Sequence, residues 1–180
     1  MKKLLSLLIT TLLISGCTSS TKVSAPGVVT SCDQIRLLES AEKSSMMGCL
    51  DGSGEIDFHQ VKGPMLINVW GSWCEGCKQE MPYFVELYQN PVFKSGEIQM
   101  LGVNVEEKSR QAAVTYIQKS GMSWPNLEDT SGISKSIFGP GVPVTWFIDE
   151  NGKNIETKIG AYTNKKQLFN QVEKAFGVKL

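Results

Sequence analysis

The sequence predicts an α/β domain whose central mixed β-sheet is flanked by helices on both faces. An apolar run, Met65–Trp70, leads directly into a helical pattern, and a second apolar run at residues 98–105 does the same. Near the C-terminus, two strand-like segments joined by a short turn precede an amphipathic helix. Parallel strands joined by helices, followed by a hairpin and a covering helix, build such a sheet.

The composition is that of a single globular domain. The chain has 180 residues, of which 41% are hydrophobic and 20% charged, and its formal net charge is zero. Loss of the segment before Cys17, which contains Lys2 and Lys3, would leave a net charge of −2. This balance gives no electrostatic reason to expect binding to nucleic acid or to anionic lipid.

The first residues predict export. Two lysines precede a short apolar run, which ends at Ser15-Gly16-Cys17. We expect a lipoprotein signal peptide at residues 1–16, lipidation of Cys17, a tether at residues 17–31 and a domain at residues 32–180. The alternatives are an ordinary secretory signal and an uncleaved anchor.

The remaining segments each have a local signature. In order, the sequence predicts a short helix at 33–43, a strand at 55–58, the buried strand Met65–Trp70, a helix at 74–88 kinked by Pro82, a strand at 98–105, a helix at 108–120 stopped by Gly121, an extended piece at 124–127, a short helix at 130–138, strands at 144–149 and 154–159, and a last helix capped by Thr163 or Asn164.

Cys74 and Cys77 form the most informative pattern. They belong to Trp73-Cys74-Glu75-Gly76-Cys77, which follows a buried strand and begins a helix. Two thiols at this spacing open and close a disulfide, and the helix N-terminus favours the thiolate of Cys74. We therefore expect Cys74 to attack a substrate disulfide and Cys77 to resolve the mixed disulfide. The neighbouring Glu75 opposes thiolate formation.

Several separated motifs together resemble the thioredoxin superfamily, and most closely its exported TlpA/ResA-like thiol-disulfide oxidoreductases. They are the run at residues 68–82, the Gly-Val-Pro-Val-Thr at residues 141–145, and the closing hairpin and helix. The resemblance covers residues 54–177. It implies the thioredoxin fold, with the extra strand and helix of this branch between Gln89 and Trp124.

Glu80 is the third candidate catalytic residue. It lies three positions after Cys77 beside apolar residues, where burial would raise the pKa of its carboxyl toward neutrality. A glutamate here is also an active-site feature of ResA-like proteins. Asn68 stands where cytosolic thioredoxins usually have a buried aspartate. Because Asn68 does not titrate, proton transfer must run through Glu80 or water.

The resemblance also implies a substrate-binding loop. Pro143 is expected to be a cis proline facing the dithiol, and Val142 to pair backbone to backbone with an extended substrate. From its position, Trp73 would shield the dithiol, with an ordinary core tryptophan as the alternative.

Cys32 and Cys49 remain after this assignment, and in an exported protein they predict a structural disulfide. A second redox pair or an interface for electron transfer is the alternative. A zinc site made with Cys74 and Cys77 is disfavoured by the spacing. We expect no metal, and His59, the one histidine, is not expected to be a ligand.

Together these observations predict a lipid-anchored thiol-disulfide oxidoreductase on the extracytoplasmic side of the cell membrane. The resemblance favours a protein disulfide reductase, with cytochrome c maturation as one role. No cofactor is expected, because electrons would arrive from another dithiol, and a membrane-embedded dithiol protein is the expected donor. The alternatives are a general disulfide oxidase or isomerase, and a non-catalytic binding lipoprotein. A peroxidase would need a Thr and Arg arrangement that we do not find.

Overall fold

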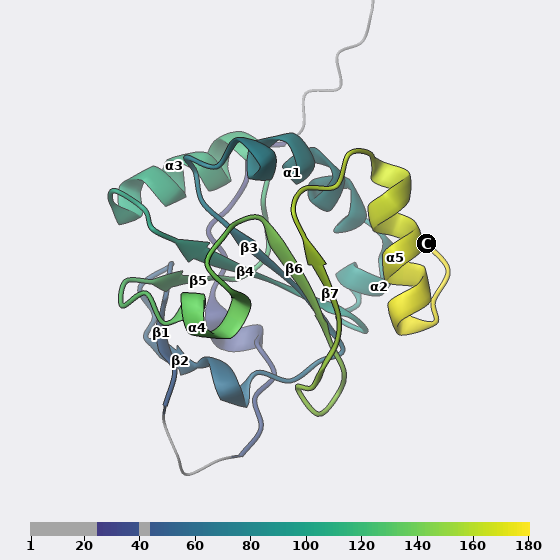
Figure 1. The fold of residues 1–180 in the computed structure, drawn as a ribbon, viewed down its shortest axis with the longest axis horizontal. Helices are drawn as coiled ribbons and strands as arrows, with labels where there is room; N and C mark the ends of the chain where they lie inside the picture. The colour runs from purple at the N-terminus through teal and green to yellow at the C-terminus, as the bar shows by residue number, and fades with distance from the viewer. Residues whose placement is uncertain (1–24, 40–43) are drawn as a thin grey trace, which may run out of the picture.

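The structure is a computed structural model, and it describes residues 25–39 and 44–180. Its strands form one seven-stranded mixed sheet with the order β2-β1-β5-β4-β3-β6-β7, which occupies the centre of Figure 1. The predicted α/β class is thereby confirmed. The expected signal peptide and Cys17 lie outside the described residues. Within the described ranges, no helix combines the length and apolar character needed to cross a membrane.

The bounds of the elements are as follows. The strands are β1 Met46–Cys49, β2 Glu55–Asp57, β3 Met65–Trp70, β4 Gln99–Val105, β5 Asn126–Asp129, β6 Val144–Ile148 and β7 Asn154–Ile159. The α-helices are α1 Glu75–Leu87, α2 Pro91–Lys94, α3 Arg110–Ser120, α4 Ser134–Phe138 and α5 Lys165–Phe176. Two short 3-10 helices cover Cys32–Gln34 and Phe58–Gln60.

Strand β3 lies at the centre of the sheet, and each of its six residues is buried. It pairs in parallel with β4 on one side and antiparallel with β6 on the other. A strand covered on both faces and both edges is expected to be a continuous apolar run, which is the pattern of this segment. Its carboxyl end therefore leads from the core straight to the start of α1.

Alternate side chains of β3 enter two separate cores. Leu66 and Trp70 pack with residues of α1, α3 and α5. Met65, Ile67 and Val69 face the opposite core, which includes residues of β1, β2 and α4. Figure 1 shows α1 and α3 together along the upper side of the sheet and α4 apart from them. By this alternation, the side chain of Asn68, two residues after Leu66 and two before Trp70, points toward α1, where it bonds to Glu80.

The expected helix at residues 33–43 is wrong over its described part. After the 3-10 turn Cys32–Gln34, the chain is extended, and Leu37 forms an isolated bridge with Val61. The backbone N–H of Leu38 donates to the Gln60 carbonyl at 2.7 Å. Because the backbone hydrogen bonds of this segment go to distant partners, its loose helical periodicity does not produce a helix.

The other long elements agree with their predictions to within two residues. Strand β3 and helices α1, α3 and α5 are in this group, and Pro82 lies inside α1. Helix α3 ends at Gly121, whose φ of 87° is the left-handed conformation that glycine adopts readily. Strand β1 and helix α2, each four residues long, were not predicted.

Candidate active site

Cys74 and Cys77 lie where β3 passes into α1, and they form a disulfide with a Cα–Cα distance of 5.3 Å. Cys74 is the N-cap of α1, and its Sγ accepts a hydrogen bond from the backbone N–H of Cys77 at 3.1 Å. Cys74 is 6% exposed, whereas Cys77 is completely buried. An approaching substrate sulfur can therefore reach only Cys74.

The position of Cys74 favours a negatively charged sulfur. Unpaired N–H groups and the positive end of the dipole of α1 lie at its N-cap. The nearby Glu75 carboxylate points toward solvent and lies 3.7 Å from the ammonium group of Lys78. This exposed ion pair and the surrounding water weaken the repulsion that Glu75 exerts on a thiolate.

The loop before Cys74 is held by the end of β4. The Glu107 carboxylate accepts hydrogen bonds from the backbone N–H and hydroxyl of Ser72, at 2.5 and 2.7 Å, and from the Asn104 side chain at 2.9 Å. The Trp73 indole N–H donates to the Val105 carbonyl at 3.3 Å. Glu107 was not among the predicted site residues. Its position just after a parallel strand was the available signal, because the carboxyl ends of β3 and β4 meet here.

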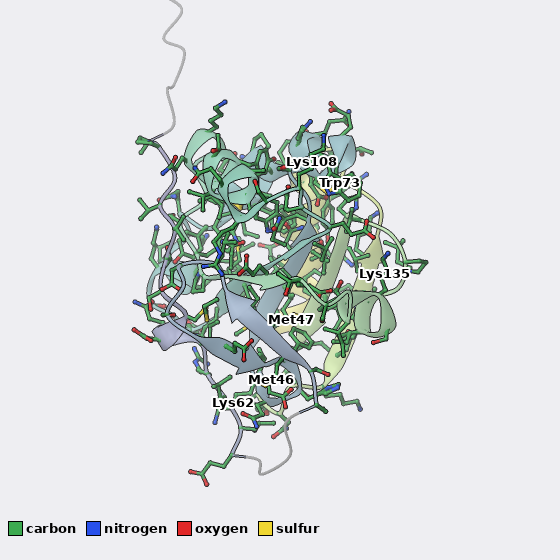
Figure 2. All side chains as sticks on the ribbon, turned by 90° about the vertical axis from the view of Figure 1, so that its left-hand side faces the viewer. Met46, Met47, Lys62, Trp73, Lys108 and Lys135 are labelled. Atoms are coloured by element: carbon green, nitrogen blue, oxygen red, sulfur yellow. A yellow bond between two sulfur atoms is a disulfide. The ribbon has the colours of Figure 1, made fainter. Side chains whose placement is uncertain are left out.

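Trp73 is 47% exposed, so it is not a core residue. Figure 2 shows it near the upper end of the molecule, with Met46 and Lys62 toward the lower end. A groove lies beside it, lined on one side by Val69 and Val105 and on the other by the loop that ends at Val142. The groove is small, with a volume of about 30 Å³.

Pro143 lies against the first turn of α1, and the Val142–Pro143 peptide bond is cis. A Cβ atom added to Gly76 would lie 3.3 Å from Cδ of Pro143. The Pro143 carbonyl accepts from the Gly160 N–H at 2.9 Å. Pro143 thus lies beside the dithiol segment, although 67 positions separate it from Gly76 in the chain.

Glu80 lies one helical turn after Cys77 and is completely buried. Its Oε1 accepts a hydrogen bond from the Asn68 side-chain amide at 3.1 Å, and its Oε2 accepts from the Tyr162 backbone N–H at 2.9 Å. Burial raises the pKa of Glu80 to about 7, although both hydrogen bonds and the charge of Lys158 lower it. A carboxyl group with this pKa exchanges protons readily near neutral pH.

Lys158 and Tyr162 are parts of the site that sequence reasoning missed. The Lys158 ammonium group donates to the carbonyls of Ile159 and Gly160, at 2.8 and 2.9 Å. It thereby holds the segment that leads to the Tyr162 N–H, and it places a positive charge near Glu80. No sequence pattern indicated this proximity, because Lys158 lies on the edge strand β7 and Glu80 on α1.

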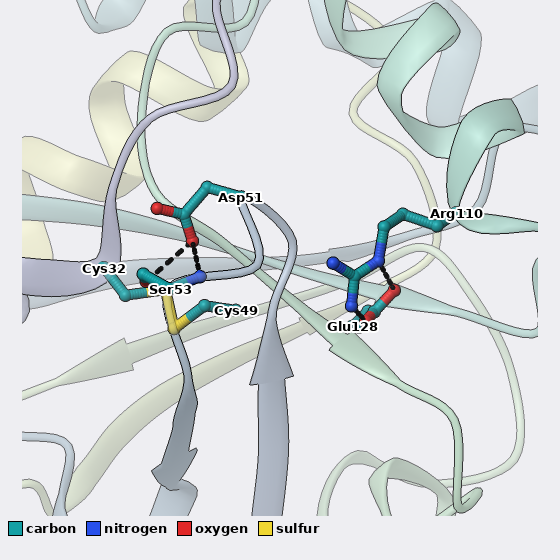
Figure 3. Close-up of polar contacts among 6 residues, drawn as sticks. All are labelled: Cys32, Cys49, Asp51, Ser53, Arg110 and Glu128. Carbon is teal, nitrogen blue, oxygen red and sulfur yellow. Dashed lines mark hydrogen bonds and ion pairs between the residues drawn. A yellow bond between two sulfur atoms is a disulfide. The ribbon is translucent and has the colours of Figure 1, made fainter.

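Cys32 and Cys49 form the second disulfide, drawn in Figure 3, with a Cα–Cα distance of 6.1 Å. Both residues are buried in the core on the α4 side of the sheet, whereas Cys74 and Cys77 belong to the opposite core. The four cysteines therefore do not gather into one metal site. Asp51 is the one acidic neighbour within ligand reach of both sulfurs among the described residues.

His59 lines a separate cavity of about 400 Å³. The other walls include Phe58, Ile137 and Trp146, and none of the proposed site residues takes part. The His59 side chain is exposed, and its backbone N–H donates to Asp57 at 3.1 Å, so the structure gives no sign of a role for His59 at the dithiol.

A family model described as the AhpC/TSA family matches residues 41–156. Among curated proteins, the thiol-disulfide oxidoreductase ResA of Bacillus thuringiensis is 31% identical to the chain over 122 residues. The alignment covers 67% of this chain and 68% of that protein.

Solved structures give the same picture of the fold. StoA of Bacillus subtilis superimposes with a TM-score of 0.56 and 25% identity, over 72% of this chain and 96% of that one. A secreted disulfide oxidoreductase of Mycobacterium tuberculosis, described as homologous to E. coli DsbE, superimposes with a TM-score of 0.61 and 18% identity. That match covers 72% of this chain and 94% of the mycobacterial chain.

Proposed function

Because this chain belongs to the AhpC/TSA family and, within the thioredoxin superfamily, to the TlpA/ResA-like thiol-disulfide oxidoreductases, we propose that it reduces disulfides in exported proteins through Cys74 and Cys77. One observation carries this proposal. An accessible cysteine caps α1 while its partner is buried one turn before a carboxyl group whose pKa is about 7. This arrangement supports thiol exchange in a fixed order, with Cys74 attacking first, Cys77 second and Glu80 as the proton acceptor.

In the first step, the Cys74 thiolate attacks one sulfur of a substrate disulfide. The substrate S–S bond breaks, a mixed disulfide forms on Cys74, and the other substrate sulfur leaves as a thiolate. The N–H of Cys77, 3.1 Å from the Cys74 sulfur, stabilises the attacking anion.

In the second step, Cys77 gives its proton to Glu80 and becomes the nucleophile. Its thiolate attacks Cys74, the mixed disulfide breaks, and the substrate sulfur leaves with the electron pair. The substrate has then gained two electrons, and Cys74 and Cys77 are joined as the structure has them. The proton on Glu80 returns to solvent or to the leaving thiolate. A second dithiol must then reduce the chain, and a membrane-embedded protein is the proposed donor.

We propose that an extended segment of the substrate pairs with the backbone of Val142, beside Pro143 and the groove at Trp73. Backbone pairing recognises extended chains with little side-chain selectivity. The resemblance to ResA-like proteins supports the haem-binding cysteines of apocytochrome c as one substrate.

The proposed location is the extracytoplasmic face of the cell membrane, through a lipid on Cys17. The basic residues, apolar run and Ser-Gly-Cys sequence at the start of the chain support this location. Metabolic labelling with a radioactive fatty acid tests it. We expect label on the full chain and none after Cys17→Ala, while label on that variant would overturn the assignment.

Trapping of mixed disulfides tests the exchange mechanism. The Cys77→Ser variant is expected to accumulate complexes that reductant releases, because its Cys74 adducts cannot be resolved. Cys74→Ser is the matched control and should trap none. Equal trapping by both variants, or none by either, would contradict the assigned order of attack.

A further inference from the structure

Asn68 carries a buried polar atom that the mechanism above does not explain. It lies on β3 between Leu66 and Trp70, is completely buried and faces α1. Its amide nitrogen donates to Oε1 of Glu80 at 3.1 Å, but its Oδ1 has no hydrogen-bond partner among the described residues. Leaving a buried carbonyl oxygen without a donor is unfavourable, so such an atom calls for an explanation.

Protonation of Glu80 changes which hydrogen bonds its carboxyl group can make. When Glu80 is ionised, both of its oxygens accept hydrogen bonds, one from Asn68 and one from the Tyr162 N–H. When Glu80 is protonated, its new O–H needs an acceptor, yet both oxygens face donors. The Tyr162 donor belongs to the backbone and cannot become an acceptor. A side-chain amide can, because a half-turn exchanges its nitrogen and its oxygen.

We propose that the side-chain amide of Asn68 makes this half-turn when Glu80 takes up a proton, so that Oδ1 accepts the new O–H. Asn68 is then a positioning residue, which gives Glu80 a hydrogen bond from β3 in both protonation states. The proposal rests on the proposed role of Glu80 as the proton acceptor of Cys77. In that step the S–H bond of Cys77 breaks, the O–H bond of Glu80 forms, and the electron pair stays on sulfur.

Other groups around Glu80 do not replace Asn68 in this role. Lys158 faces it from β7 with a positive charge and has no lone pair to offer. Tyr116 on α3 and Tyr162 before α5 are also near, and burial raises the pKa of each, so both remain neutral near pH 7. Cys77 is the proton source on α1. Among the described residues, the Asn68 side chain is the one that bonds directly to the Glu80 carboxyl and can both donate and accept.

Nuclear magnetic resonance of the oxidised full chain tests the proposal, because the disulfide keeps Cys74 and Cys77 from titrating. The carbon shift of the Glu80 carboxyl locates its ionisation. Above that pH, we expect a strong Overhauser effect between the Asn68 amide protons and the Glu80 γ-methylene. Below it, this effect should weaken by roughly fivefold or more, because the half-turn moves the amide protons away. An unchanged effect on both sides of the ionisation overturns the proposal.

The Glu80→Gln variant provides a second, independent test of the amide orientation. Its amide nitrogen donates at every pH, so Asn68 should stay turned and the Overhauser effect to the γ-methylene should stay weak throughout. A strong effect in this variant overturns the half-turn. If the wild-type Glu80 carbon shift does not move between about pH 5 and 9, the proton-acceptor role fails instead, and the glutamine arm still decides the amide orientation.

Asn68→Leu separates positioning from simple packing. Without the amide, the ionised carboxylate keeps only the Tyr162 N–H, so the pH midpoint for resolution by Cys77 should rise by about one pH unit. An equal loss of rate at every pH, with no shift of the midpoint, would show that Asn68 is only structural and would overturn its positioning role.

Discussion

The backbone N–H of Tyr162 donates to Oε2 of Glu80 at 2.9 Å, although 82 positions separate the two residues in the chain. This contact ties the segment before α5 to the helix that carries the dithiol. It holds the carboxyl group in a buried place, where desolvation raises the pKa of Glu80 to about 7. The hydrogen bond from Tyr162 itself lowers the pKa of Glu80, so the segment before α5 moderates the effect of burial on this carboxyl group.

The first prediction is that Glu80 makes the protein less stable as pH rises. The pKa of Glu80 is about 7 in the folded state against 4.5 for an ordinary glutamate, so between these values the folded state binds more protons. Its contribution is fully present below pH 4.5 and is lost as pH rises through 7. The shift corresponds to about 3 kcal/mol.

Urea unfolding of the oxidised protein at several pH values measures this effect. In Glu80→Gln, the decline in the free energy of unfolding across this window should be smaller by that amount. Identical pH dependence in the two proteins would show that Glu80 is not titrating with a raised pKa.

The second prediction concerns Lys158. Its charge lowers the pKa of Glu80, so Lys158→Met should raise the pH midpoint of the Glu80 ionisation by roughly half a pH unit. Lys158→Arg keeps the charge and should leave the midpoint nearly unchanged. The carbon shift of the Glu80 carboxyl reports both. An unchanged midpoint in Lys158→Met would show that Lys158 does not influence the ionisation of Glu80.

The third prediction is that Glu107 fixes the loop in front of Cys74. Glu107→Ala removes the acceptor of three hydrogen bonds, two of them from Ser72. The loss should destabilise the fold by about 1–3 kcal/mol and slow the alkylation of reduced Cys74. Glu107→Gln keeps the side-chain shape and one acceptor oxygen. Its stability and its rate of Cys74 alkylation should therefore lie between those of Glu107→Ala and the wild type. Wild-type stability and reactivity in Glu107→Ala would show that the loop before Cys74 keeps its conformation without Glu107.

The fourth prediction separates the two disulfides. Cys32 and Cys49 are 17 positions apart and both buried, which supports a structural role. Replacing both with alanine should cost about 3 kcal/mol of stability on the chain-entropy model. Thiol exchange at Cys74 should continue at its wild-type rate below the unfolding temperature. If exchange stopped in a folded double variant, the pair would instead be a second redox site.

A structural feature could be predicted from the sequence where it depends on residues that are neighbours in the chain. Met65–Trp70 and the start of α1 were predictable, because a continuous apolar run and an N-cap cysteine depend on neighbours in the chain. The same holds for the burial of Glu80, three residues after Cys77. The partners of Glu80 were not predictable, because Tyr162 and Lys158 reach it only through the assembled sheet and α5.

The segment at residues 33–43 illustrates the opposite case. Its apolar spacing favoured a helix, but Leu37 and Leu38 bond to Val61 and Gln60 instead. Tertiary backbone pairing outweighed a weak local preference. Asn68 lies between these cases. Its uncharged side chain could be read from the sequence, whereas its unpaired oxygen became visible only once α1 was in place.

The measurement that tests the central claim most directly is the reduction potential of the Cys74–Cys77 couple. It is titrated against glutathione or dithiothreitol, and the peptide that contains both cysteines is followed by alkylation and mass spectrometry. This readout excludes the Cys32–Cys49 disulfide. A reductase predicts a potential near or below that of thioredoxin, about −270 mV. A potential near about −120 mV, that of a strong oxidant, would show that the protein makes disulfides and would contradict the proposed direction.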